Sequence, residues 1–432
     1  MPKEPVSHII VSRHGDRWGK PLAICVVIAA FLAAWYAVSW QIGAMLAELT
    51  PTSQPDSQRV AEMAVALAPN DPGTYWLLAT KEKEKFSPES FDNASGLFEE
   101  VVRRSPYDYR WWIELGRANE QSENVERAEI ALRRAAELAP NFTYPRWQLG
   151  NFYLRQNRTS EAFAELKKTT EGSLKYRDQV FSLAWDYFDK DPARVEEIAA
   201  DTPDVRASLA LFYAVHDSPA DALRVWNAVP DEEKAARPAI GKTIAQGFFD
   251  RHHFRESLEF ARQAGLDPDA KAETITNGGF EAFVGNNDSL FDWKVNRNDG
   301  KLDIATDSSV KHSGGRSIRF AFRGYAKPDL YNLSQFVAVE ASEKYKISFW
   351  VRTENLRSGG GPRLEVADGN DGTVLAASEP FAGNSNEWQQ FTLDILVPNG
   401  RSGIVIRTGR QSCADCPIFG TFWYDDLSLT KQ

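Results

Sequence analysis

A run of 27 residues without Asp, Glu, Lys or Arg lies between Lys20 and Glu48, near the start of this 432-residue chain. Its centre, residues 22–38, is almost entirely Ala, Val, Ile, Leu and Phe. A helix of about 20 apolar residues crosses the hydrocarbon core of a bilayer. A cleaved signal peptide has a shorter apolar stretch, about 7–15 residues, and a small-residue cleavage site, and residues 44–47 form a poor one. We therefore predict an uncleaved transmembrane helix at residues 21–47.

The charges on the two sides of this span predict its orientation. Lys3, Arg13 and Arg17 precede it, whereas no Lys or Arg follows it before Arg59. Positive residues that flank a membrane helix tend to stay in the cytoplasm. We therefore expect a cytoplasmic tail at residues 1–20 and a single-pass plasma-membrane protein. The rest of the chain then lies outside the cytoplasm, which in a bacterium is the periplasm.

Composition excludes several classes of protein. The net charge is −10, and no dense Lys or Arg run occurs, so nucleic acid is not an expected partner. Three Cys are too few for a disulfide-dense scaffold or a four-Cys zinc module. Six His, of which only His252 and His253 are close together, leave little for a histidine-rich metal site.

Residues 51–265 carry a helical pattern with an internal period, because Pro69, Pro106 and Pro140 each end an Ala-rich apolar face. These prolines are 37 and then 34 residues apart. A small residue at 116 allows two antiparallel helices to touch, and Pro140 stops the second helix. The clearest unit resembles a tetratricopeptide repeat at seven positions: Trp112, Leu115, Gly116, Ala128, Leu132, Ala135 and Pro140.

The repeat signal weakens along the chain. In the next unit, 34 positions later, the repeat pattern recurs at Leu149, Gly150, Ala162 and Leu166, but no Pro ends that unit. The resemblance to tetratricopeptide repeats covers roughly residues 58–174, and degenerate units follow from about 175. It implies an all-α solenoid.

The resemblance to tetratricopeptide repeats also implies a concave groove that binds a protein partner. Arg and aromatic side chains there would suit an extended peptide or a carboxylate-bearing partner. Two alternatives stay open: these residues are ordinary solvated or packing side chains, or the repeats are only a spacer. The positions expected to face the groove are Arg110, Ile113, Arg117, Tyr144, Trp147, Asn151 and Arg155.

After residue 265 the helical period gives way to short alternating segments separated by turns rich in Gly and Asn. Seven or more short strands in about 155 residues predict an antiparallel sandwich or jelly roll at residues 275–431. The expected strands are 317–322, 334–339, 345–352, 363–366, 389–397, 403–408 and 419–429.

A succession of motifs marks this region. In chain order the motifs are Asn277-Gly278-Gly279-Phe280-Glu281, Ser313-Gly314-Gly315-Arg316-Ser317, the strand that contains Trp350, Trp388-Gln389-Gln390-Phe391, and Tyr424-Asp425-Asp426-Leu427. This succession resembles the carbohydrate-binding jelly rolls of the galactose-binding-like superfamily. The resemblance implies a module that binds a glycan. Many of the landmark residues are core residues, so the resemblance indicates the fold more strongly than the binding.

Sugar sites use exposed aromatic faces together with polar groups that bond hydroxyls. Trp350 and Trp388 are expected in the core. Each candidate has the alternative of packing under a loop. The glycan-binding candidates are aromatic residues in predicted loops, with an arginine as donor: Trp293, Tyr325, Tyr331, Phe381 and Arg363.

Two further sites concern stability. Members of the resembling family often hold a structural calcium ion, and the matching positions are Glu281 and Asp425. The two carboxylates are alternatively plain polar edge residues. Cys413 and Cys416 lie in a turn, where an oxidising compartment favours a small structural disulfide.

The anchor, the repeats and the sandwich account for nearly the whole chain. The sequence has no Gly-rich phosphate loop, no His-Glu-x-x-His and no Gly-x-Ser-x-Gly. We therefore expect a membrane-anchored scaffold that is not an enzyme and has no cofactor beyond the possible calcium ion. Its repeats would bind a protein and its sandwich a glycan, in cell-surface or exopolysaccharide assembly or export. The alternatives are a pure protein–protein adaptor and an enzyme whose site is hidden in the sandwich.

Overall fold

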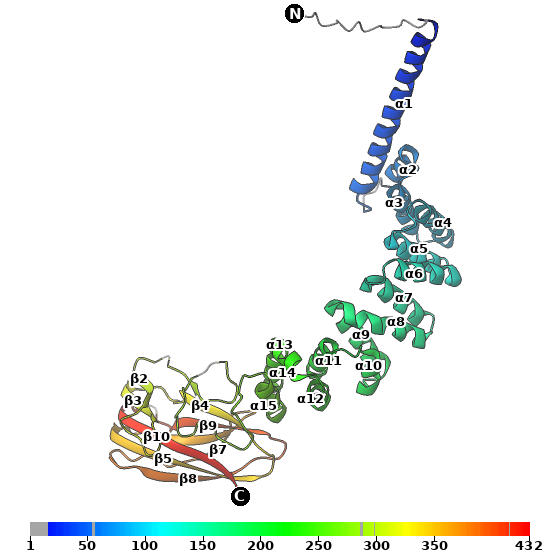
Figure 1. Cartoon of the computed structure of the whole chain (residues 1–432). Coiled ribbons are helices and arrows are strands. Elements are labelled where there is room, and N and C mark those ends of the chain that lie inside the picture. The colour runs from blue at the N-terminus through cyan, green and yellow to red at the C-terminus, as the bar shows by residue number, and fades with distance from the viewer. Residues whose placement is uncertain (1–15, 54–56, 286–287, 298, 414) are drawn as a thin grey trace, which may run out of the picture. The chain divides into compact units, whose positions relative to one another are not determined.

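The computed structural model describes residues 16–53, 57–285, 288–297, 299–413 and 415–432. The chain divides into two compact units, the first ending at Val180 and the second starting at Phe181. The first contains a long helix and paired helices, and the second contains further paired helices and two β-sheets (Figure 1). The predicted fold class is confirmed: an apolar N-terminal helix, a helical repeat region and an antiparallel β-sandwich.

The helices of the first unit follow one another with short turns and pack in pairs (Figure 1). Side chains of Asp71, Ser87 and Asp108 cap helix N-termini, and Ser87 and Ser90 form a reciprocal capping box. The helices are α1 (Asp16–Leu49), α2 (Ser57–Leu67), α3 (Pro72–Lys83), α4 (Pro88–Arg104), α5 (Tyr109–Gln121), α6 (Val125–Leu138), α7 (Thr143–Arg155), α8 (Thr159–Gly172) and α9 (Leu174–Tyr187), the last of which crosses the unit boundary.

Two glycines set the close approach within the repeat hairpins. A Cβ atom on Gly116 of α5 would lie 2.6 Å from Leu132 Cγ of α6. A Cβ atom on Gly150 of α7 would lie 2.7 Å from Leu166 Cγ of α8. Atoms this close would clash, so no larger residue fits at either position. The two glycines of the repeat pattern therefore lie where the paired helices touch.

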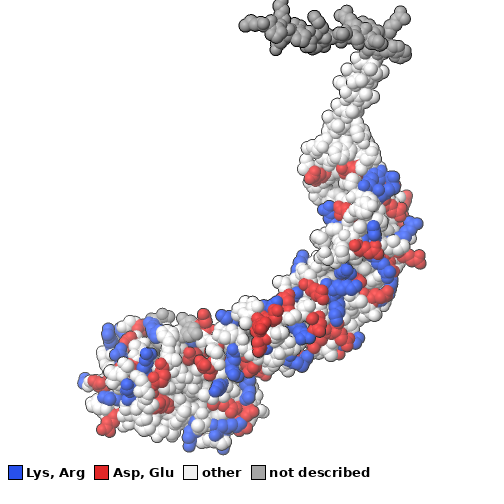
Figure 2. Space-filling model, viewed as in Figure 1, with Lys and Arg blue, Asp and Glu red and all other residues white. Residues whose placement is uncertain are grey.

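Helix α1 is at once the apolar segment and part of the first hairpin. Among the described residues, its segment Lys20–Leu49 is long and apolar enough to cross a membrane, and the stretch before Gly43 carries no charged residue after Lys20 (Figure 2). Its last turns pack on α2, since a Cβ atom on Gly43 would lie 2.7 Å from Ala68 Cβ and Ala47 is buried. α1 is one uninterrupted helix, so the predicted span at 21–47 includes the turns that pack on α2.

The helices of the second unit continue the pairing. α11 pairs with α12, and α14 pairs with α15. Tyr213 of α11 donates a hydrogen bond from its hydroxyl to Pro192 O, which joins α11 to the start of α10. After α9 the helices are α10 (Pro192–Ile198), α11 (Pro203–Val215), α12 (Pro219–Asn227), α13 (Asp231–Ala236), α14 (Pro238–Asp250) and α15 (Phe254–Gln263).

Two five-stranded sheets form the sandwich, and all their strand pairs are antiparallel. The first sheet has the order β1-β4-β9-β6-β7, and the second has the order β2-β3-β10-β5-β8. The strands are β1 (Lys294–Val295), β2 (Leu302–Asp307), β3 (Ser317–Tyr325), β4 (Leu333–Ala338), β5 (Lys344–Arg357), β6 (Pro362–Asp368), β7 (Val374–Ala377), β8 (Gln389–Leu396), β9 (Gly403–Arg410) and β10 (Ile418–Lys431).

Aromatic side chains fill the space between the sheets. Phe320 and Phe422 stack with their ring centroids 4.5 Å apart, and Phe349, Phe381 and Tyr424 surround them. Tyr424 is fully buried, and burial raises the pKa of its hydroxyl. The core is therefore continuous from one sheet to the other.

The last helical hairpin packs directly on the first sheet. Phe249 of α14 lies 4.7 Å from the ring of Phe336 on β4, and Phe254 at the start of α15 lies 5.6 Å from the same ring. A Cβ atom on Gly403 would lie 2.3 Å from Phe254 Cδ2. The predicted boundary near residues 265–275 therefore separates helices from strands, but it does not separate two compact bodies.

Candidate functional site

The outer face of the first sheet presents a row of polar residues. Lys294 on β1 pairs with Ser334 on β4, Ser334 pairs with Arg407 on β9, and Arg407 pairs with Glu365 on β6. Residues directly paired across antiparallel strands point to the same face of a sheet. Ile404 and Ile406 alternate with Arg407 and belong to the core, so the row lies on the outside.

Glu365 is the centre of an ion-pair cluster in this row. Its Oε1 accepts hydrogen bonds from Arg363 Nε at 3.0 Å and Nη2 at 2.8 Å, and its Oε2 accepts one from Arg407 Nε at 3.3 Å. The Glu365 side chain is only 4% exposed although it lies on an outer face. Gly409 makes the room, because a Cβ atom there would lie 2.3 Å from Glu365 Cδ. The cluster holds both guanidinium groups in fixed positions.

Tyr331 lies beside this cluster. The Arg407 guanidinium carbon is 3.8 Å from the centroid of the Tyr331 ring, and Arg407 Nη2 donates a hydrogen bond to the Tyr331 hydroxyl at 3.2 Å. Tyr331 remains 46% exposed. An exposed ring beside two positioned guanidinium groups combines a stacking surface with hydrogen-bond donors, which is what a hydroxyl-rich ligand requires.

Three of the predicted stacking residues are core residues. Trp293, Tyr325 and Phe381 are 1%, 1% and 5% exposed, so the expectation of exposed aromatic faces in loops is wrong for them. Trp293 Nε1 donates to Asn277 O at 3.1 Å, and the Tyr325 hydroxyl donates to Asp329 O at 2.8 Å. Burial raises the pKa of Tyr325 to about 12. Tyr325 is the last residue of β3, whereas Trp293 and Phe381 lie in connecting segments, and all three rings belong to the core between the sheets.

Of the predicted glycan-binding set, the structure brings Tyr331 and Arg363 together with Glu365, Arg407 and Gly409. Sequence reasoning misses the last three. A signal existed for Arg407 and Glu365, because both fall on the outer faces of expected strands. Arg407 alternates with Ile404 and Ile406, and Glu365 alternates with Leu364 and Val366. Gly409 lies one residue beyond the expected strand 403–408, so its effect on the burial of Glu365 gives no local signal.

Trp350 also differs from expectation. It is half-buried on the outer face of the second sheet, where His312 stacks on it with ring centroids 3.9 Å apart. Trp388 is half-buried and lies 5.8 Å from the same imidazole. The expected core position is therefore wrong for both Trp350 and Trp388, since neither belongs to the core between the sheets.

The two calcium candidates converge on one loop. Glu281 Oε1 accepts hydrogen bonds from the backbone N–H groups of Gly315 and Arg316, at 2.7 and 3.3 Å. Asp425 Oδ2 accepts from those of His312 and Ser313, at 2.7 and 3.2 Å. Burial raises the pKa of Asp425, so a bound cation would offset the cost of its ionised form.

Calcium binding at this loop stays a prediction. The described residues contain no group of three or more His, Cys, Asp or Glu side chains placed to hold a metal ion. Glu281 and Asp425 would therefore need backbone carbonyls as further ligands. The calcium dependence of the melting temperature would test this.

Cys413 and Cys416 are joined by a disulfide. The buried guanidinium of Arg410 donates to three backbone carbonyls in this region, those of Lys327, Gly360 and Cys416. Burial lowers the pKa of Arg410. The disulfide and Arg410 together hold three loops at one end of the sandwich.

All three predicted groove arginines are held by carboxylates of their own surface. Arg110 is paired with Asp108, Arg117 with Glu114 at 3.3 Å, and Arg155 with Glu120 through two bonds of 2.6 and 2.8 Å. Ile113 is 1% exposed, so its expected place in an open groove is wrong. It packs between helices instead.

An aromatic cluster remains at the other predicted groove positions. Trp147 lies 5.4 Å and Tyr144 6.5 Å from the ring of Tyr176 on α9. Asn151 Nδ2 donates to Trp147 O at 2.8 Å. Tyr144 is 36% exposed. The cluster is a partly exposed aromatic surface of the repeats.

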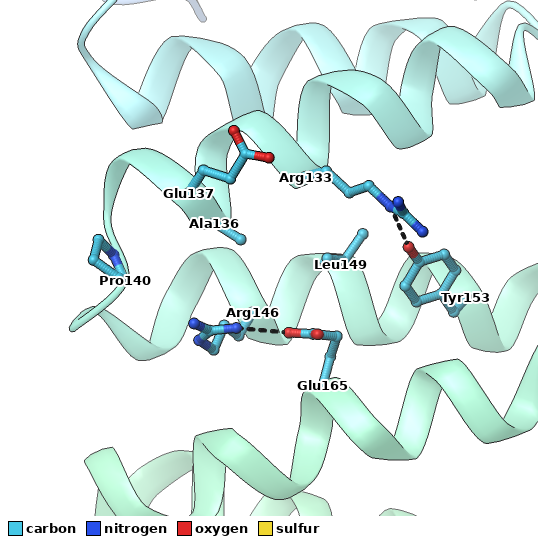
Figure 3. A pocket seen from close by; sticks show the side chains of 8 residues that line it. All are labelled: Arg133, Ala136, Glu137, Pro140, Arg146, Leu149, Tyr153 and Glu165. Atoms are coloured by element: carbon cyan, nitrogen blue, oxygen red, sulfur yellow. Dashed lines mark hydrogen bonds and ion pairs between the residues drawn. The ribbon is translucent and has the colours of Figure 1, made fainter.

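A separate hollow of about 310 Å³ lies between α6, α7 and α8 (Figure 3). Arg146 and Glu165 are joined across it at 2.9 Å, and Arg133 Nε donates to the Tyr153 hydroxyl at 2.9 Å. Leu149 is part of its lining. Arg146 and Glu165 pair with each other. Arg133 pairs with Glu129 and Glu137 pairs with Arg134, so each charged group of the lining has a partner within the repeats.

The described residues form a helical-repeat region followed by an antiparallel β-sandwich. Residues 272–411 match the model of a family described as "Carbohydrate binding domain", which confirms the predicted resemblance for this domain. No curated protein matches the chain.

Several solved structures are similar to parts of the chain. One described as "CBM4 structure and function" is 17% identical with a TM-score of 0.28, covering 37% of this chain and 99% of that one. MamA from Desulfovibrio magneticus RS-1 is 24% identical with a TM-score of 0.26, covering 32% and 74%. TmCBM61 in complex with β-1,4-galactotriose is 20% identical with a TM-score of 0.26, covering 38% and 100%.

Proposed function

We propose that this chain is a non-enzymatic, membrane-anchored scaffold whose sandwich binds a glycan and whose repeats bind a protein partner. The observation that carries the proposal is the outer face of the first sheet, where Tyr331 is exposed beside the ion-pair cluster of Glu365, Arg363 and Arg407. The match of residues 272–411 to a carbohydrate-binding family supports it. The partner surface in this proposal is the aromatic cluster of Tyr144, Trp147 and Tyr176.

The structure supports an anchor rather than a cleaved signal sequence. Cleavage near residues 44–47 would remove the turns of α1 that cover Ala61, Ala64 and Ala68, which are fully buried. The burial of these alanines by α1 supports an anchor that stays attached to the repeats. With the basic residues before the span, we propose a cytoplasmic N-terminus and an extracytoplasmic bulk. Cell-surface or exopolysaccharide assembly or export is the proposed setting.

The glycan proposal is tested with the full-length chain in detergent, by affinity electrophoresis in xylan, β-1,4-glucan, β-1,4-galactan and mannan. We expect retention by at least one polymer. Tyr331→Ala and Arg407→Ala should each weaken retention about tenfold, because each removes part of the stacking and donor surface, worth about 1.4 kcal/mol. Tyr331→Phe should keep most of the affinity.

The matched control is Tyr107→Ala, since Tyr107 is 83% exposed in the repeats. It should migrate like the unaltered chain. Melting temperatures of the Tyr331 and Tyr107 variants should agree with that of the unaltered chain within about 2 °C. Retention unchanged by both alanine substitutions would show that the glycan, if bound, lies elsewhere.

The second candidate is a protein–protein adaptor. It is favoured by the burial of Trp293, Tyr325 and Phe381, which leaves Tyr331 as the exposed member of the four predicted stacking aromatics. A folded chain that no polysaccharide retains would support the adaptor.

The anchor is tested by the mass of the purified protein and by a reporter. We expect a chain of 48.5 kDa, with the apolar helix still attached. Alkaline phosphatase fused after Gln432 should be active in a bacterial host, because that enzyme folds only outside the cytoplasm. An inactive fusion, or a mass that lacks the first 44–47 residues, would contradict the topology.

A further inference from the structure

A groove of about 670 Å³ lies between α14 and the edge of the first sheet. Its lining includes two apolar residues, Leu266 and Leu290. Polar side chains surround them: Lys242, Gln246 and Asp250 come from successive turns of α14. Apolar surface with a few convergent polar groups is typical of small-ligand sites.

The groove has fixed walls. Phe249 on the same helix packs on Phe336 of β4, with ring centroids 4.7 Å apart. On the opposite side, the buried carboxylate of Asp267 accepts the backbone N–H of Leu290 at 2.9 Å and is bonded to the Ser289 hydroxyl. The helix and the loop before β1 are therefore held independently, and the groove does not depend on a ligand for its shape.

The groove is continuous with the polar row on the first sheet. Lys294 of β1 lines the groove and also begins the register row that runs through Ser334 to Arg407 and Glu365. With neighbouring strands about 4.8 Å apart, three strand steps separate Lys294 from Glu365 by about 14 Å. A ligand must therefore consist of several linked units to contact both the groove and the Tyr331–Arg407 cluster.

We propose that this groove is a second subsite for the same glycan chain, in which α14 binds the units that extend beyond the Tyr331–Arg407 cluster. The inference rests on the proposed glycan binding. The groove carries lysine, aspartate and amide groups together, so its ligand is an uncharged, hydroxyl-rich chain rather than a polyanion. Helix α14 precedes the residues matched by the carbohydrate-binding family, so this wall is an addition to the domain.

The experiment measures chain-length dependence with the full-length protein. The ligands are the disaccharide and the hexasaccharide of whichever β-1,4-linked polymer, glucan, galactan, xylan or mannan, retains the unaltered chain. The double variant Lys242→Ala, Gln246→Ala should lose about tenfold in affinity for the hexasaccharide and less than about twofold for the disaccharide. Removing two hydrogen-bonding groups accounts for a loss of this size.

A blocking variant gives an independent measurement. A Cβ atom on Gly247 would meet only the flexible end of Arg251 at 3.1 Å, so Gly247→Trp is compatible with α14 and fills the groove. It should abolish the advantage of the hexasaccharide over the disaccharide. Lys346→Ala, on the outer face of the second sheet, is the matched control and should change neither affinity.

The outcomes separate the two proposals. Equal hexasaccharide affinity in the unaltered chain, the double variant and Gly247→Trp would overturn the α14 subsite and leave the proposed function standing. Loss of disaccharide and hexasaccharide binding together in the groove variants would also overturn it, because the groove would then not be a separate subsite. Failure of the unaltered chain to bind any polymer would overturn the proposed function and the subsite with it.

Discussion

Replacing Trp293 with alanine is expected to destabilise the sandwich, and to weaken glycan binding only through that loss of stability. The side chain is 1% exposed, its ring centroid lies 5.3 Å from that of Phe280, and it donates its indole N–H to Asn277 O. Removing a fully buried Trp leaves a large cavity and typically costs about 3–5 kcal/mol. For a domain of this size the melting temperature should fall by roughly 10 °C. Differential scanning calorimetry of the full-length chain measures this.

Two control variants separate a loss of stability from a loss of glycan binding. Phe283→Ala removes a ring that is 72% exposed in the same domain and should leave the melting temperature nearly unchanged. Tyr331→Ala should lose binding without losing stability. If the Trp293→Ala chain had an unchanged melting temperature but no longer bound the glycan, Trp293 would be a ligand contact. That result would contradict its buried position.

Phe254→Ala is expected to separate the last helical hairpin from the sandwich. Phe254 is 1% exposed and fills the space that Gly403 leaves, beside Phe249 and Phe336. Truncating it should cost about 3–5 kcal/mol. Because this ring links helices to strands, the loss should divide one calorimetric transition of the second unit into two. Residues 264–275 should become sensitive to limited proteolysis.

Phe86→Ala, at a ring that is 79% exposed in the repeats, is the control and should leave both measurements unchanged. A single undivided transition at the original temperature in Phe254→Ala would show that the hairpin and the sandwich are not coupled through this ring. The α14 groove would then lack its proposed support.

The fold could be predicted from the sequence where a local pattern carries it. Gly116 and Gly150 are spaced by one repeat, and each lies at the predicted contact of two helices. The seven expected strands all occur, because each alternates over several residues. Three strands were missed: β1 has two residues, β7 has four, and β2 carries three polar residues in six. Short or polar segments give little periodic signal.

The candidate site could be predicted only in part, because burial depends on distant residues. Trp293 and Phe381 lie in segments that read as loops, and only the folded chain shows that these loops cover the core. Arg407 meets Tyr331 across 76 positions of sequence, and Glu365 is buried because Gly409 stands on the neighbouring strand. No local pattern contains such pairings.

The boundary between anchor and repeats could not be predicted for a related reason. Gly43 and Ala47 are small and apolar, so they fit a membrane span as well as a helix–helix contact. In the structure they pack against Ala68 and its surroundings.

The continuity of α1 has a mechanical consequence under the proposed topology. The 22 residues from Pro21 to Ile42 extend about 33 Å as a helix, which is close to the thickness of the hydrocarbon core. No flexible linker separates the membrane-spanning part of α1 from the part that packs on the first repeat, so this repeat would lie at the level of the lipid headgroups. Any tilt or rotation of the membrane helix would then move the first repeat with it.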